Sequence, residues 1–224
     1  MADFLDKSNV AVAARVTRNR DVVTSPNYLK WLAQGKVFEA GFGPEDTAAD
    51  SQAAIDDTLA TFALQASGST KIVIPLLLKL AMTADGGALT RLDVAFTKPA
   101  GLCATALTLT GGRAMTSIHN MYRTSPAQTG PTASALYGAA TTFAITVSAL
   151  VAADYVNAHY ETWIDAALTV MTQRQTITFN FMNEGVPHGM TAGAVMLVYI
   201  NTAVADSTWL PYIQWAEVEE EDLL

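Results

Sequence analysis

The segment Thr176–Phe181, with the sequence TITFNF, alternates a hydroxyl or amide side chain with a large apolar one at every step. Because successive residues of a β-strand point to opposite faces, this pattern is typical of a strand that is buried on one face only. The segment Thr142–Ser148 repeats the pattern, with Phe143, Ile145 and Val147 on one face. Both segments predict half-buried strands of an antiparallel sheet.

Six further stretches are rich in apolar and β-branched residues and are separated by Gly, Pro, Ser, Thr and Asn clusters, as strands are. The turn residues Asp85-Gly86-Gly87 predict that Ile72–Thr83 and Arg91–Phe96 form a hairpin. About eight strands in two sheets is the jelly-roll number. The predicted fold is therefore an all-β, antiparallel, two-sheet, jelly-roll-like β-sandwich. The six stretches are Leu59–Ala66, Ile72–Thr83, Arg91–Phe96, Thr105–Thr110, Ala194–Thr202 and Trp209–Val218.

One or two short helices are expected beside these strands. Ser25 as N-cap, Pro26 at the first helical position and Gly35 near the stop predict one helix. The segment Asp154–Asp165 spaces its apolar residues near one helical turn and predicts another. Residues 1–57 otherwise lack an alternating pattern. We therefore expect an irregular N-terminal arm with a short helix over residues 1–57, and the β-sandwich with an acidic C-terminal tail over residues 58–224.

Composition excludes several classes of protein. The most apolar stretch, Ile72–Leu80, contains Pro75 and Lys79 and is shorter than the roughly 20 residues of a spanning helix, so no membrane span is expected. The net charge of −8 disfavours direct binding to nucleic acid, which needs clustered cations. The single cysteine, Cys103, is expected to be a small buried residue at the start of a strand.

Charged residues are scarce, at 15% of the chain, and unevenly placed. No Asp or Glu occurs between Asp93 and Asp154, and the stretch from Gly185 to Ala205 has no charged residue. A free monomer usually scatters charges over its exposed strands. These segments therefore indicate surfaces covered by another subunit. The alternative is a large two-layer core with Thr and Ser facing water.

No pattern of catalytic, cofactor-binding or metal-binding residues is found in the sequence. The Gly-x-Ser-x-Gly, phosphate-loop and dinucleotide motifs are absent. His119, His159 and His188 are far apart, and none has a second ligand at metal-binding spacing. Paired acids such as Asp56-Asp57 or Glu161 with Asp165 are expected to be solvated. We therefore expect a non-enzymatic protein without cofactor or metal.

The two ends of the chain carry opposite charges. Arg15, Arg18 and Arg20 belong either to a solvated loop or to an arm that lies on an acidic neighbour or inside a shell. The tail Glu217–Leu224 is dominated by acids and is expected to stay solvated. It could alternatively pair with the three arginines of a neighbouring subunit. We assign these arginines to a subunit interface.

The densest aromatic cluster is Trp209–Trp215. As a strand it places Trp209 and Trp215 on one face and Tyr212 on the other. Exposed aromatic rings can stack on sugars, but two occupied faces favour core or interface packing. Trp209, Tyr212 and Trp215 are therefore also assigned to a subunit interface.

The segment Val186–Ile200, with Trp209–Val218 as a closing strand, resembles the Gly-containing turn and long apolar strand near the end of many viral jelly-roll proteins. The resemblance implies a capsid, decoration or tail component of a virus or bacteriophage, commonly trimeric. Its partners would be itself and other virion proteins, in the virion and, during assembly, in the host cytoplasm. The alternative is a carbohydrate- or receptor-binding β-sandwich, with calcium held by the oxygens of Asp46–Asp57. An enzyme on a β-barrel would require a histidine to converge with a carboxylate in a pocket.

Overall fold

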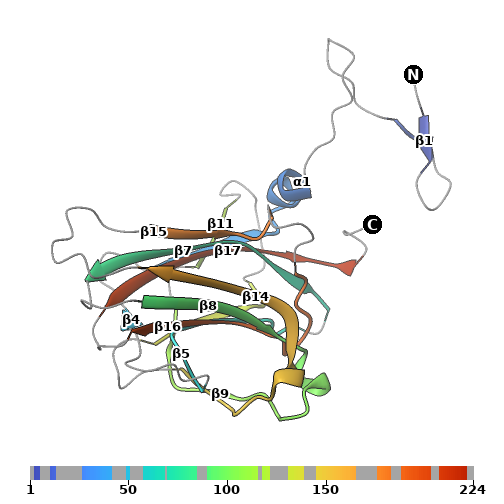
Figure 1. Ribbon diagram of the computed structural model, residues 1–224. Helices are drawn as coiled ribbons and strands as arrows, with labels where there is room; N and C mark the ends of the chain where they lie inside the picture. The colour runs from blue at the N-terminus through green and yellow to red at the C-terminus, as the bar shows by residue number, and fades with distance from the viewer. Residues whose placement is uncertain are drawn as a thin grey trace.

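The computed structural model describes residues 3–5, 11–13, 27–41, 49–50, 58–68, 70–84, 90–115, 118–121, 131–138, 145–164, 176–182, 188–202 and 207–220 (Figure 1). The described chain is mostly β. It also contains one short helix, α1 (Asn27–Ala33), and the 3-10 turns η1 (Ala100–Leu102) and η2 (Ala152–Asp154). Two small antiparallel sheets complete the described structure. One pairs β1 (Asp3–Leu5) with β2 (Ala11–Ala13). In the other, β13 (Ile145–Val147) lies between β5 (Leu59–Ala60) and β9 (Leu109–Thr110).

Two large antiparallel sheets form the body of the protein, and we name each after its central strand. The β17 sheet has the order β11-β3-β17-β7-β15, with β4 also paired to β17. Its strands are β11 (Ile118–Asn120), β3 (Val37–Gly41), β17 (Thr208–Val218), β7 (Ile72–Ala84), β15 (Thr176–Asn180) and β4 (Ala49–Asp50). The β16 sheet has the order β10-β12-β6-β16-β8-β14. Its strands are β10 (Arg113–Ala114), β12 (Ser134–Tyr137), β6 (Phe62–Gln65), β16 (Val195–Thr202), β8 (Thr90–Thr97) and β14 (Tyr155–Ile164).

The main core lies between these sheets, so the fold is β-sandwich-like (Figure 1). Met196, Val198 and Ile200 of β16 belong to one buried cluster with Trp209 and Ile213 of β17. The alternate β16 residues, Val195, Leu197 and Tyr199, face away and pack with Ile145 and Val147 of β13. Because β16 is covered on both faces, it is apolar at almost every position. A third cluster packs Trp31 of α1 on the outer face of the β17 sheet, against Ile74, Leu76, Ala216 and Val218.

The predicted hairpin of Ile72–Thr83 with Arg91–Phe96 is wrong. β7 lies in the β17 sheet, where it pairs with β17 and β15, whereas β8 lies in the β16 sheet between β16 and β14. Both strands are largely buried, so their backbone N–H and C=O groups need a neighbouring strand on each side. Those partners follow much later in the chain, and the chain passes from one sheet to the other between β7 and β8.

The predicted helix at Asp154–Asp165 is also wrong, because Tyr155–Ile164 forms β14 and pairs with β8. Residues four apart share one face of a helix, but they also share one face of a strand. The spacing of Tyr155, His159 and Trp163 therefore fits both structures. The aromatic and β-branched content of the segment favours the strand.

The helix predicted after Ser25-Pro26 is confirmed as α1; those two residues lie outside the described ones. The strand β3 was not predicted: it lies within the expected arm, yet pairs with β17 and β11. Cys103 follows η1 and is half-buried rather than at the start of a strand. The predicted strands Ala194–Thr202, Trp209–Val218 and Thr176–Phe181 are confirmed as β16, β17 and β15.

Candidate functional site

A pocket of about 160 Å³ lies at the end of the sandwich where α1 leads into β3. It brings together two cationic and two anionic side chains from separate segments of the chain. Its lining residues are Gln34, Gly35, Lys36, Phe38, Lys71, Glu217 and Glu219.

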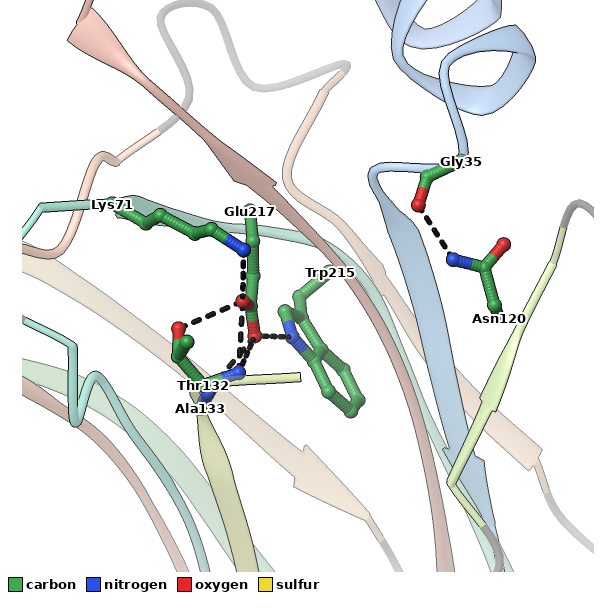
Figure 2. Close-up of polar contacts among 7 residues, drawn as sticks. All are labelled: Gly35, Lys71, Asn120, Thr132, Ala133, Trp215 and Glu217. Carbon is green, nitrogen blue, oxygen red and sulfur yellow. Dashed lines mark hydrogen bonds and ion pairs between the residues drawn. The ribbon is translucent and has the colours of Figure 1, made fainter. Parts of the chain in front are cut away.

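The carboxylate of Glu217 in this pocket accepts hydrogen bonds from several donors (Figure 2). Both of its oxygens lie 2.9 Å from the backbone nitrogen of Thr132, and Oε2 also accepts a bond from the Thr132 hydroxyl at 2.7 Å. The backbone nitrogen of Ala133 donates to Oε1 at 2.9 Å, and the indole nitrogen of Trp215 donates to the same oxygen at 3.1 Å. Lys71 Nζ lies 3.7 Å from Oε2.

This arrangement links the two sheets. Glu217 belongs to β17, whereas Thr132 and Ala133 directly precede β12 of the β16 sheet. Since the carboxylate accepts from several donors, its lone pairs are occupied and it is poorly placed to accept a proton from a substrate. The geometry therefore fits a structural connection better than an acid or base.

The prediction of a solvated tail is wrong for Glu217, which is only 2% exposed. Glu219 and Glu220 are exposed, as predicted. Alternation along β17 explains the difference: Trp209, Ile213 and Trp215 face the core, and Glu217 continues the same odd-numbered row.

Asp154 is a second buried carboxylate, and it connects η2 to the chain after η1. Its Oδ2 accepts from the Val151 nitrogen at 3.0 Å, and its Oδ1 accepts from the Ala104 nitrogen at 2.5 Å. Backbone hydrogen bonds, first that of Val151, together with the charge of Lys98, hold the pKa of Asp154 below its ordinary value of 3.8 against the opposing effect of burial. Asp154 is therefore ionised at neutral pH.

The outer face of the β17 sheet carries a smaller polar network. The Tyr212 hydroxyl donates to Glu39 Oε2 at 2.6 Å and accepts from the side-chain nitrogen of Gln214. Lys79 Nζ lies 5.9 Å from the centre of the Tyr212 ring. The ring lies so close to β3 that a Cβ added at Gly41 would be 3.1 Å from it.

The residues assigned to a subunit interface differ in how far they are buried. Trp209 and Trp215 are fully buried within the chain, whereas Tyr212 keeps exposed surface. Arg15, Arg18 and Arg20 lie outside the described residues. A role of these residues in subunit contacts stays a prediction.

The three histidines lie in separate segments of the chain. His119 is exposed on β11, and the ring of the half-buried His188 is 4.9 Å from that of Phe96. His159 of β14 pairs through its backbone with Ala95 of β8. Within the described ranges, no three His, Cys, Asp or Glu residues gather as metal ligands would.

Sequence reasoning overlooked the roles of Glu217 and Asp154. Alternation along Trp209–Val218 was a usable signal for Glu217. No local signal indicated Ala104 as a partner of Asp154.

The helices of the described chain are all too short or too polar to cross a membrane. Comparison with known protein families, curated proteins and solved structures finds no match to this chain.

Proposed function

We propose that this chain is a non-enzymatic structural subunit of a virus particle, with a jelly-roll fold, that assembles with itself and with other virion proteins through uncharged apolar faces. The main support is the order in which its strands pair. Because the paired strands are far apart in the sequence, their pairing order distinguishes one β topology from another. The amount of strand alone does not.

Eight strands of the two large sheets follow one another along the chain as β3, β6, β7, β8, β14, β15, β16 and β17. The first pairs with the last, the second with the seventh, the third with the sixth, and the fourth with the fifth. A jelly roll has this nested pairing because one long antiparallel ribbon is wound into two sheets. Jelly rolls are common in viral capsid proteins, and they also occur in lectins and cupins.

The distribution of charge supports self-assembly. The segment between Asp93 and Asp154 has no acid in a chain of net charge −8. Part of it is exposed, including Leu102 and Val151. Exposed apolar surface is typical of regions that a partner covers. We expect a trimer or a larger closed assembly.

Electron microscopy of the concentrated, purified chain tests this proposal. Rings or shells of uniform size are the expected result. Single particles of monomer size at every concentration would contradict it.

A carbohydrate- or receptor-binding module is the second candidate, and one observation favours it. Tyr212 lies half-buried on the outer face of the β17 sheet beside Glu39, Gln214 and Lys79, so an aromatic ring and polar groups share one surface. Because Trp209 and Trp215 are buried, they cannot stack on a sugar. A glycan screen tests this candidate: binding that is lost in Tyr212→Ala supports it, and no binding to any glycan contradicts a sugar-binding role.

A further inference from the structure

Exposed apolar side chains are concentrated at one place on the surface. We define the apolar tip as residues 100–106 and 149–156, which contain η1, η2 and the first residues of β14 (Figure 1). Leu102, Val151 and Val156 are 70%, 48% and 38% exposed. In the described part of the chain, Leu29 is the one other large apolar side chain that is exposed to a comparable extent.

A single buried carboxylate holds the tip together. Asp154 binds the backbone nitrogens of Ala104 and Val151, so the two turns lie side by side. The backbone oxygen of Asp154 also accepts from the Lys98 nitrogen at 2.8 Å. These hydrogen bonds therefore hold the backbone of the two turns that carry Leu102 and Val151.

The base of the tip is closely packed. Gly193, with φ of +81°, lies against η1, and a Cβ added there would be 2.8 Å from the Ala100 Cβ. A pre-ordered surface loses little conformational entropy when it binds. The tip therefore combines exposed apolar groups with a rigid support, which favours docking.

Charge indicates which partner fits. Asp154 is the one Asp or Glu in the tip, and its side chain is buried and held by the bonds described above. Two copies of a chain with net charge −8 repel each other wherever their acids face one another. At the tip they can approach without opposing acids, and like-charge repulsion across the contact is avoided.

We propose that the apolar tip is a contact between copies of this chain, in which Leu102 and Val151 of each copy pack against the same residues of its neighbour around a symmetry axis. This inference rests on the proposed self-assembly, and it names the surface that carries it.

The test introduces one negative charge at the contact. Leu102→Asp is compared with Thr178→Asp, which makes the same charge change at an exposed position on β15. Both sites are exposed, so both variants are expected to fold. We expect the midpoint concentration of assembly, measured by analytical ultracentrifugation, to rise at least about tenfold for Leu102→Asp, equivalent to about 1.4 kcal/mol of contact energy. Thr178→Asp should assemble like the parent chain.

The outcomes separate this inference from the proposed function. If the parent chain assembles and Leu102→Asp assembles equally well, the tip contact is wrong and the structural role stands. If the parent chain is monomeric at every concentration, both are wrong. If the parent stays monomeric and floats with phosphatidylcholine vesicles, and Leu102→Asp does not float, the tip binds lipid and the inference is overturned.

A cross-linking experiment tests the symmetric packing. Leu102→Cys in a Cys103→Ser background should form a disulfide-linked dimer under mild oxidation, because equivalent residues meet at the axis. Thr178→Cys in the same background is the control and should remain single chains. Equal dimer yields from both variants would contradict the proposed contact.

Discussion

Glu217 of β17 holds the backbone of Thr132, which precedes a strand of the opposite sheet, with both carboxylate oxygens 2.9 Å from the Thr132 nitrogen. Removal of this carboxylate should destabilise the sandwich. Glu217→Ala leaves the N–H groups of Thr132, Ala133 and Trp215 without their acceptor, at a cost of about 3 to 5 kcal/mol. Glu217→Gln keeps the volume but turns an NH₂ group toward donors, so we expect a smaller loss. Urea denaturation measures both.

Glu220→Gln is the matched control, because it removes the same charge from an exposed position two residues outside β17. Its unfolding midpoint should equal that of the parent chain. Equal midpoints for Glu217→Gln, Glu217→Ala and the parent would contradict the linking role of Glu217.

Acid should weaken the support of the tip. The pKa of Asp154 is lowered in the folded protein, first by the hydrogen bond from the Val151 backbone. The ionised group therefore contributes stability above its unfolded pKa, ordinarily 3.8, and that contribution is lost as pH falls through the lower folded value. Asp154→Asn cannot titrate. We expect the stability difference between the parent and Asp154→Asn, measured in urea, to be largest near neutral pH and to shrink below the unfolded pKa. A difference that grows in acid would contradict this.

A glycine pair tests the packing between η1 and the loop before β16. Gly193→Ala places a Cβ against Ala100 at a positive φ, so we expect a loss of about 1 to 3 kcal/mol. Gly101→Ala meets no atom within 4 Å and should change stability by less than about 0.5 kcal/mol. Thermal unfolding of the two variants gives the comparison. Equal melting temperatures would show that the approach of Gly193 to Ala100 is not close.

We expect that replacing Asn201 of β16 with an apolar residue stabilises the protein. It is 3% exposed, and neither its amide oxygen nor its amide nitrogen has a hydrogen-bond partner in the described structure. Asn201→Val removes these unsatisfied groups and suits a strand, so the unfolding free energy should rise by about 1 kcal/mol. Asn201→Asp should lower it, because a charge is costly there. A lower stability for Asn201→Val would indicate that the amide has a partner in solution.

The strand-rich fold was predictable from the sequence, because alternation is a local signal. Thr176–Phe181, Ala194–Thr202 and Trp209–Val218 were each identified from their own residues. Pairing was not predictable, since β7 and β8 follow one another but lie in different sheets. The turn chemistry between them permits a hairpin but does not impose one.

The hydrogen-bond partners of the two buried carboxylates were likewise not predictable from local sequence. Glu217 lies on the core-facing row of β17 but was grouped with the neighbouring tail acids. Asp154 binds the Val151 nitrogen nearby, but its other partner, Ala104, is fifty positions away. Partners at such separations are set by how the sheets close, which composition and spacing do not encode locally.

The most direct test of self-assembly is the mass of the purified chain in solution, measured by light scattering at low and high salt. We expect a trimer or larger species at both, because an apolar contact is not screened by salt. An increase of monomer at high salt would instead implicate the charged ends of the chain. A clean monomer at high concentration under both conditions would contradict a structural subunit and favour the binding module.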